Sequence, residues 1–146
     1  MTSTIRSERE RAGLTQDRLA ELAGVAQSNL SAIESGKRVA TPQMLARLRR
    51  HMRRPSEALE QYRDEVRQAI SECGACNPRV FGSVARGTDV PGSDLDLLVT
   101  VPPEAAWRFV SLKPRLVALL GVDVDVISDN GLTDKHRAIV REARPL

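Results

Sequence analysis

The chain has 146 residues, of which only 3% are aromatic, and a formal net charge of +3. This length fits one ordinary domain or two small ones, each with a modest core built from Leu, Val, Ile and Ala. It has no apolar run of about 18 residues and no charged-then-apolar amino terminus, so we expect neither a membrane span nor a signal peptide. Two cysteines are too few for a disulfide framework, which favours a reduced, cytoplasmic setting.

The net charge is divided unevenly along the chain. Residues 1–54 carry 11 Lys and Arg against 5 Asp and Glu, a net +6, whereas residues 55–146 carry 11 against 14, a net −3. A basic first part and a mildly acidic second part predict two modules with different partners, the first of them a polyanion.

Short helices are predicted throughout the basic part. They cover residues 2–13, 14–24, 25–36 and 42–54. Thr15 is a suitable N-cap for the second helix, Gly36 a stop for the third, and Pro42 a first-turn residue of the fourth. Pro55 then breaks the chain, so we expect an all-α domain of four or five helices over residues 1–54 and a second domain over residues 55–146.

The second domain is predicted to alternate helices and strands. A long amphipathic helix begins at Ser56, with apolar residues at helical spacing as far as Ile70. The predicted strands are residues 79–82, 94–101 and 122–128. The further helical segments are residues 103–121, interrupted near Pro114, and residues 133–146. This alternation indicates an α/β or α+β domain.

The residues from Arg9 to Val25 and from Ile33 to Arg38 form a helix-turn-helix pattern. They read R-x-x-x-G-L-T-Q-x-x-L-A-x-x-A-G-V and I-E-S-G-K-R, and the pattern resembles the XRE/Cro-repressor family over about residues 3–54. The resemblance implies a third helix in the major groove of operator DNA. The residues that it places on bases are Gln27, Ser28, Asn29 and Ser31, and those on phosphates are Gln16, Lys37 and Arg38.

One residue departs from that family, and one alternative stays open. Ala26 stands where the family usually has a capping Ser or Thr, so the start of the third helix is expected to be weaker. The alternative is a helical dimerisation module whose basic residues are only a solvated face. A protein that reads a palindrome is expected to be a dimer.

A pair of carboxylates follows a glycine-rich turn in the second domain. Ten residues separate Ser83 from Asp94, and Asp96 lies two residues further, on the same face of the predicted strand. Carboxylates this close repel each other unless a cation lies between them, and divalent ions with oxygen ligands are the usual solution. The turn leaves backbone amides and the Ser83 hydroxyl available for phosphate. These parts predict phosphoryl or nucleotidyl transfer with two metal ions.

Gly82-Ser83, ten residues and Asp94-x-Asp96 resemble the signature of the DNA-polymerase-β-like nucleotidyltransferases. The wider pattern over residues 56–146 resembles their minimal, MNT-type branch, which implies a small mixed sheet flanked by helices. That branch has a third carboxylate on a later strand, which the alignment places at Asp125, with Asp123 as the alternative.

The same resemblance assigns roles to these residues. Gly82 and Ser83 would hold the β- and γ-phosphates of ATP, and Asp94 and Asp96 would bind both Mg²⁺ ions. Asp125 would complete the metal site and help to activate the attacking hydroxyl. Arg86 would neutralise triphosphate charge or stabilise the loop. The alternative for this segment is a tight turn followed by a strand with two capping aspartates.

Four residues outside these motifs have simpler interpretations. Cys73 and Cys76 are expected to be ordinary thiols near a helix end, because no second C-x-x-C accompanies them. Trp107 and Phe109 are expected in the core.

By resemblance, the two modules together favour an antitoxin. It would repress its own operon and neutralise a cognate toxin, which in similar systems is often a HEPN-type ribonuclease, by Mg²⁺-dependent transfer of AMP to a toxin hydroxyl. Two alternatives remain: a repressor that acts by binding only, with an inactive transferase domain, and a transferase acting on tRNA or a small molecule. A homodimer or a complex with the toxin is expected.

Overall fold

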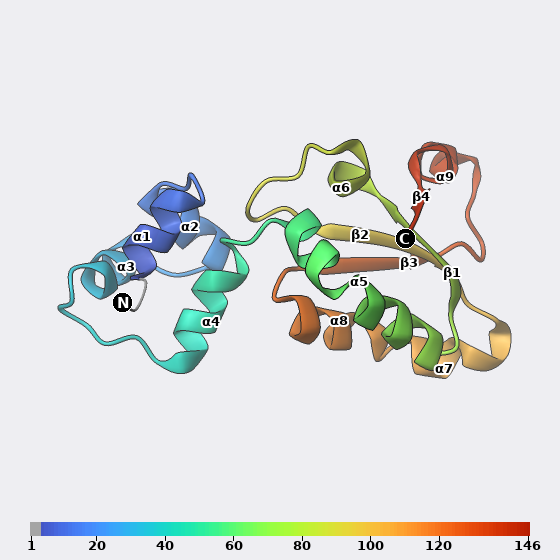
Figure 1. Cartoon of the computed structure of the whole chain (residues 1–146), viewed down its shortest axis with the longest axis horizontal. Coiled ribbons are helices and arrows are strands. Elements are labelled where there is room, and N and C mark those ends of the chain that lie inside the picture. The colour runs from blue at the N-terminus through green and yellow to red at the C-terminus, as the bar shows by residue number, and fades with distance from the viewer. Residues whose placement is uncertain (1–3) are drawn as a thin grey trace. The chain divides into compact units, whose positions relative to one another are not determined.

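The computed structural model describes residues 4–146, which divide into two compact units at Arg53 and Arg54 (Figure 1). The first unit is helical and the second has a four-stranded mixed sheet flanked by helices, which confirms the predicted fold class. No helix in the described residues is long and apolar enough to cross a membrane.

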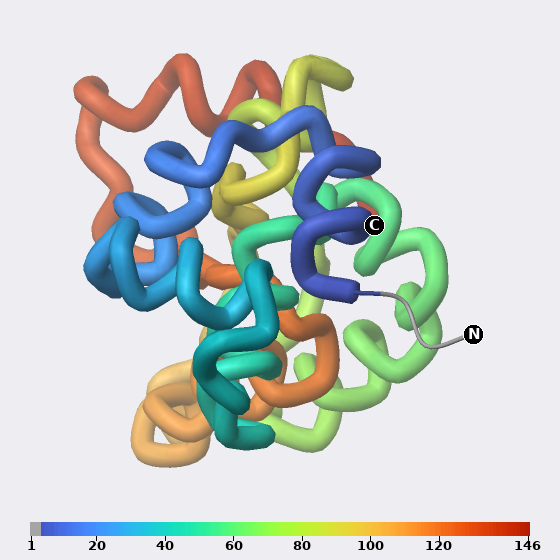
Figure 2. The backbone as a smooth tube through the Cα atoms, turned by 90° about the vertical axis from the view of Figure 1, so that its left-hand side faces the viewer, coloured from blue at the N-terminus to red at the C-terminus, as the bar shows by residue number. Residues whose placement is uncertain are grey.

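Over residues 4–53 the first unit contains four short helices, whose path can be followed in Figure 2. They are α1 (Ile5–Arg11), α2 (Gln16–Ala23), α3 (Gln27–Glu34) and α4 (Pro42–Arg50). The first helix was predicted to begin at residue 2, and residues 2 and 3 lie outside the described part of the chain. The helices enclose a small apolar core, formed by Ile5, Leu19, Ala20, Ala23, Leu30 and Leu48.

Threonine N-caps position three of these helices. Thr4, Thr15 and Thr41 each accept a hydrogen bond from the backbone amide three residues further along. Ala26, at the start of α3, makes no side-chain cap bond, as its residue type predicts. Gly36 is the stop predicted for the third helix: α3 ends at Glu34, Ser35 is its C-cap, and Gly36 follows with a left-handed φ of +80°.

The sheet of the second unit has the strand order β3-β2-β1-β4. Its strands are β1 (Cys76–Phe81), β2 (Leu95–Thr100), β3 (Val124–Ser128) and β4 (Arg144–Pro145). β1 pairs antiparallel with both β2 and β4, whereas β2 and β3 are parallel.

Helices on the two sides of the strands complete the second unit (Figure 1). They are α5 (Pro55–Glu72), α6 (Gly82–Arg86), α7 (Ala106–Phe109), α8 (Leu112–Leu120) and α9 (Arg137–Glu142), with 3-10 turns η1 (Pro103–Ala105) and η2 (Asp134–His136). α5 and α8 pack together and cover the face formed by Leu95, Leu97 and Val99 of β2. α6 and α9 contact each other on the opposite side of the strands. The intervening β2 residues, Asp96 among them, therefore face away from the α5–α8 layer.

The end of the chain differs from the prediction. A single helix was expected over residues 133–146, but α9 ends at Glu142 and Arg144–Pro145 pairs with Arg79 and Val80 of β1. Pro145 explains the change, because the residue before a proline is disfavoured in helical conformation and favoured in extended conformation. The Leu146 amide donates to the Pro78 carbonyl at 3.1 Å, which fixes the end of the chain against β1.

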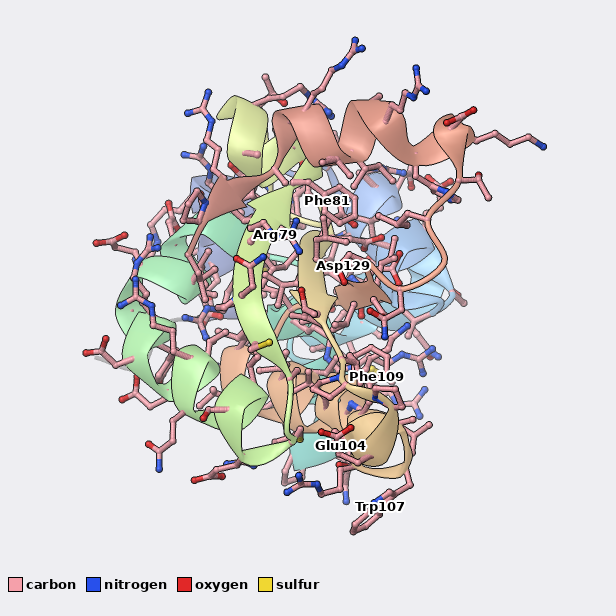
Figure 3. All side chains as sticks on the ribbon, turned by 90° about the vertical axis from the view of Figure 1, so that its right-hand side faces the viewer. Arg79, Phe81, Glu104, Trp107, Phe109 and Asp129 are labelled. Atoms are coloured by element: carbon pink, nitrogen blue, oxygen red, sulfur yellow. The ribbon has the colours of Figure 1, made fainter. Side chains whose placement is uncertain are left out.

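The helical segment after β2 also differs in two respects. The interruption lies at Val110 and Ser111, and Pro114 falls in the first turn of α8, where a missing amide is tolerated. Trp107 is 74% exposed and points away from the body of the unit, so the prediction that it lies in the core is wrong (Figure 3). Phe109 does pack against the core. Residues two apart on a helix lie about 200° apart around its axis, so one short turn cannot bury both.

The two cysteines are free. Cys73 is buried at the end of α5 and Cys76 is exposed at the start of β1.

Candidate functional site

The Gly82-Ser83 pair lies where β1 runs directly into α6, so the predicted turn is a short helix. Gly82 has a φ of +71°, which favours glycine, and a Cβ at this position would lie 2.1 Å from Oδ2 of Asp96. Only glycine therefore lets the backbone of this junction approach the Asp96 carboxylate. The Ser83 carbonyl accepts a hydrogen bond from the Thr88 amide at 2.9 Å, which closes the end of α6.

Two strand pairings meet at Asp96. It pairs with Phe81, the last residue of β1, and with Asp125 on the parallel strand β3. Asp94 precedes β2 by one residue, on the same face as Asp96. Asp96 is half-buried, whereas Asp94 and Asp125 are exposed. The fold thus gathers the three predicted carboxylates and Gly82 at one end of adjacent strands.

The neighbouring carboxylates and the burial of Asp96 change its pKa. Burial, and then the negative charges of Asp94 and Asp125, raise the pKa of Asp96 to about 6. Arg86 acts in the opposite direction, and Glu142 adds to the increase. The site therefore carries more negative charge than its own cations neutralise.

The donor set suits a hard divalent cation, because it consists of carboxylate oxygens under mutual repulsion. In residues 4–146, however, the His, Cys, Asp and Glu side chains form no group of three or more spaced to hold a metal ion. Asp125 rather than Asp123 is the register partner of Asp96 and acts on its pKa. The carbonyl of Asp123 instead accepts a hydrogen bond from the Leu95 amide at 2.9 Å.

The residues predicted to contact DNA lie around the turn between α2 and α3. Gly24 makes this turn with a φ of +66°. Three of the predicted base-contacting residues are on the first turn of α3, where Gln27 and Ser28 are exposed and Asn29 is half-buried. Ser31, one turn further along α3, is half-buried, and Lys37 and Arg38 are exposed beyond the helix.

Comparison with known proteins matches both units. A helix-turn-helix model matches residues 5–59, and a nucleotidyltransferase domain model matches residues 59–146. The chain belongs to the nucleotidyltransferase domain family. A solved structure described as a candidate minimal nucleotidyltransferase is 43% identical, with a TM-score of 0.57, and the match covers 62% of this chain and 95% of that chain. No curated protein matches significantly. The predicted fusion of an XRE-type helix-turn-helix domain with a minimal nucleotidyltransferase domain is confirmed.

A residue of the transferase domain that was not predicted from the sequence lies beside this site. Glu142, the last residue of α9, accepts a hydrogen bond from the Gly82 amide at 3.0 Å and one from Nη1 of Arg86 at 2.5 Å. The hydrogen bond from Arg86 has the larger effect and that from the Gly82 amide the smaller, and together they hold the pKa of Glu142 below its ordinary value. Nothing in the local sequence distinguishes Glu142 from other charged helix residues, because its partners lie about 60 positions away.

In the helix-turn-helix domain, the predicted DNA-binding side chains are already linked to one another. Nε2 of Gln27 donates to Oε1 of Gln16 at 2.5 Å, and Nη1 of Arg38 donates to Oδ1 of Asn29 at 2.5 Å. Gln16 in turn donates to Glu34 at 2.7 Å. These bonds limit the rotamers of the side chains predicted to contact bases, Gln27 and Asn29, and of their partners Gln16 and Arg38, which are predicted to contact phosphates.

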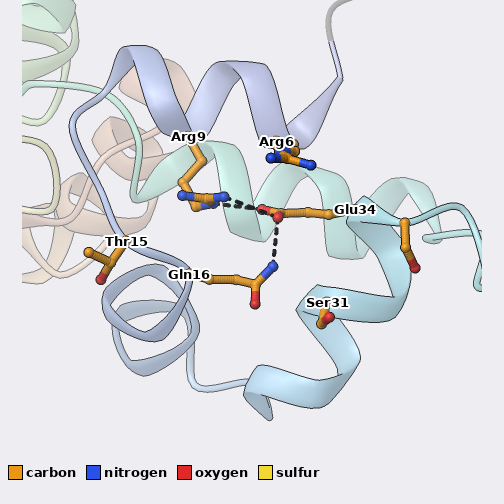
Figure 4. A pocket seen from close by; sticks show the side chains of 7 residues that line it. Arg6, Arg9, Thr15, Gln16, Ser31 and Glu34 are labelled. Carbon is orange, nitrogen blue, oxygen red and sulfur yellow. Dashed lines mark hydrogen bonds and ion pairs between the residues drawn. The ribbon is translucent and has the colours of Figure 1, made fainter.

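An open cavity of about 500 Å³ lies beside this network (Figure 4). Its lining residues are Arg6, Arg9, Thr15, Gln16, Ser31, Glu34 and Ser35. At its base Arg9 makes two bonds to Glu34, at 2.7 and 3.1 Å, and a third to the Leu14 carbonyl at 2.8 Å. Gln16, predicted to contact DNA, is therefore held by a buried ion pair, and Ser31, also predicted to contact DNA, lines the same cavity.

Proposed function

We propose that the chain is an antitoxin-like regulator: its helix-turn-helix domain binds operator DNA, and its transferase domain moves AMP from ATP to a hydroxyl of a cognate toxin protein. The observation that supports catalysis best is the position of Asp96. It lies against the Gly82 backbone and beside two further carboxylates, with a raised pKa.

Each residue has a part in the proposed transfer. Asp94, Asp96 and Asp125 would hold Mg²⁺, which, when bound, lowers the pKa of the acceptor hydroxyl and neutralises charge on the phosphates. Gly82 and Ser83 would bind the β- and γ-phosphates, with Arg86 as their cation. The hydroxyl gives up its proton to solvent, its oxygen attacks the α-phosphorus, and the bond from that phosphorus to the pyrophosphate leaving group breaks.

The fusion of the two domains supports a regulatory role. A DNA-binding domain on the same chain would let the protein repress its own operon. The net charge of −3 over residues 55–146 favours a protein acceptor over tRNA, because a polyanion is bound by positive surfaces.

The experiment for catalysis combines the purified protein, the product of the neighbouring gene, Mg²⁺ and ATP, and follows intact mass. We expect the partner to gain one or more AMP groups. Asp125→Asn should lower the rate roughly 100-fold or more, because several kcal/mol of transition-state stabilisation depend on the metal ligands. Asp123→Asn is the matched control and should retain most activity.

Two results would contradict this assignment. Equal losses in the Asp123 and Asp125 variants would remove the distinction between them. A tight complex with the partner and no transfer from any nucleoside triphosphate would instead support a repressor and antitoxin that acts by binding only.

The experiment for DNA binding uses DNA from upstream of the chain's own gene. Asn29→Ala should weaken specific binding by about 5- to 100-fold, the value of one bidentate base contact, with little effect on unrelated DNA. Lys37→Ala should weaken binding to every sequence and lower the salt dependence by about one counterion. Fluorescence anisotropy over a series of NaCl concentrations measures both effects. If Asn29→Ala changed specific and non-specific binding equally, the base contact would be wrong.

A further inference from the structure

Glu142 occupies two of the three groups that the proposed function assigns to the triphosphate, the Gly82 amide and the Arg86 guanidinium. One of its carboxylate oxygens accepts a hydrogen bond from the Gly82 amide at 3.0 Å, and the other accepts one from the Arg86 guanidinium at 2.5 Å. A carboxylate held between a backbone amide and a guanidinium has the same interactions as a phosphate oxygen pair. The subsite is therefore filled by an anion from the chain itself.

A fourth carboxylate is unfavourable for the rest of the site. Asp94, Asp96 and Asp125 already repel one another, and Glu142 adds to the negative field at Asp96. Glu142 thus disfavours the charged form of Asp96, whereas its two hydrogen bonds and the charge of Arg86 hold Glu142 itself in place. A nucleoside triphosphate that brings Mg²⁺ offers the same two donors more negative charge and also neutralises the aspartates.

We propose that Glu142 is an internal occupant of the triphosphate subsite, which a nucleoside triphosphate must displace before it can bind in the reactive position. This inference rests on the proposed function, because it takes the nucleotide to bind at Gly82 and Arg86.

The exposure of the two side chains permits such an exchange. The Glu142 side chain is 26% exposed and that of Arg86 is 54% exposed, so both can rotate towards solvent without opening the core. Only protein molecules in which Glu142 has left the subsite can bind the triphosphate. We call the fraction of such molecules the open fraction. The apparent dissociation constant equals the intrinsic one divided by this open fraction. Glu142 consequently sets a concentration threshold for nucleotide and leaves the chemical step unchanged.

The effect should depend on the phosphate chain rather than on the base. Tripolyphosphate has the phosphate groups that compete with Glu142 but no nucleoside, whereas AMP lacks the β- and γ-phosphates. Removal of Glu142 should therefore tighten binding of ATP analogues and of tripolyphosphate, and leave AMP binding unchanged.

Isothermal titration calorimetry of the full chain with Mg²⁺ tests this. The probes are α,β-methylene-ATP, which cannot transfer AMP, tripolyphosphate and AMP. Glu142→Gln keeps the size of the side chain and removes its charge, and Glu142→Ala removes the contact. We expect both to bind the first two probes about tenfold more tightly than the wild type, corresponding to an open fraction of about one tenth. The gain should shrink in high salt, which screens the competing charges.

Two further variants complete the design. Glu65→Gln removes a charge from an exposed position on α5 and should bind all probes like the wild type. Arg86→Gln should weaken binding of the triphosphate probes. Melting temperatures identify any variant that has lost its fold.

The outcomes separate the inference from the function on which it rests. If the wild type binds both triphosphate probes and the Glu142 variants bind them equally or more weakly, Glu142 only positions Arg86 and the inference is wrong. If neither the wild type nor any folded variant binds these probes, the proposed function fails and the inference fails with it. An equal gain for AMP would show a general charge effect instead of competition at the phosphates, and would also overturn the inference.

Discussion

Replacing Asp96 by Asn is expected to abolish nucleotidyl transfer and, at the same time, to stabilise the transferase domain at neutral pH. Loss of a ligand shared by both proposed metal ions should lower the rate by about 1000-fold or more. The stabilisation follows from the pKa of Asp96, which burial, Asp94 and Asp125 raise from 3.8 to about 6. Because the native state holds this proton more tightly than the unfolded state, stability falls as the pH rises through this interval and stays low above it. Asn has no such dependence.

The size and sign of the effect can be measured by thermal unfolding without Mg²⁺. Allowing for solvent screening, we expect a gain of about 1 kcal/mol or more at pH 7.5, which raises the melting temperature by at least about 4 °C for a domain of this size. The gain should vanish below the ordinary pKa of Asp, because both states are then protonated. Mg²⁺ should stabilise the wild type but not the variant.

Asp64→Asn is a matched control for this substitution. Its side chain is 93% exposed on α5, so its melting temperature should follow that of the wild type at every pH. A fall in the melting temperature of Asp96→Asn at pH 7.5 would mean that the charged carboxylate stabilises the domain without a metal. Such a result would remove the electrostatic argument for a cation site.

The carboxylate face of the site could be predicted because it depends on strand periodicity. Leu95, Leu97 and Val99 must face the core, so the alternation alone places Asp96 on the opposite face. The glycine of the Gly-Ser pair was also predictable, although its full reason was not. Only the structure shows that a Cβ at Gly82 would collide with Asp96.

Features that depend on distant parts of the chain were not predictable in the same way. Glu142 reaches Gly82 only because β4 returns the end of the chain to β1, and the two-residue strand Arg144–Pro145 is too short to produce an alternating pattern. Trp107 was misplaced for a different, local reason. Its apolar character predicts burial, but the four-residue helix α7 presents it to solvent.

Replacing Glu34 by Ala is expected to unfold the helix-turn-helix domain. Arg9 and Glu34 have side chains only 10% and 4% exposed, and they form a two-bond ion pair between α1 and α3. Burial tends to raise the pKa of Glu34, but hydrogen bonds from Arg9 and Gln16 outweigh it and hold the pKa below its ordinary value. Loss of one partner leaves a buried, uncompensated charge, which costs about 3–5 kcal/mol. That is comparable with the whole stability of a unit of this length, about 3–8 kcal/mol.

The sign of the pH dependence follows from the same pair. Because the pKa of Glu34 is lowered on folding, its contribution is present above the ordinary pKa of Glu and is lost as the pH falls through the native value. Acid should therefore weaken the wild-type domain in the way that Glu34→Ala weakens it at neutral pH. Helical circular dichroism and operator binding measure the two effects.

Two matched variants decide whether the buried charge is the cause. Glu21→Ala removes a carboxylate that is 73% exposed and paired with Arg18, and should change stability by less than about 0.5 kcal/mol. The double variant Arg9→Met with Glu34→Leu removes both charges and should recover the fold, because apolar pairs of similar size replace buried ion pairs at little cost.

The same double variant should affect DNA binding. Gln16 loses its hydrogen bond to Glu34, so it can no longer hold Gln27, which donates to it, in a fixed position. We therefore expect the double variant to be folded but to bind operator DNA more weakly than the wild type. Full operator affinity would mean that the ion pair serves the fold alone.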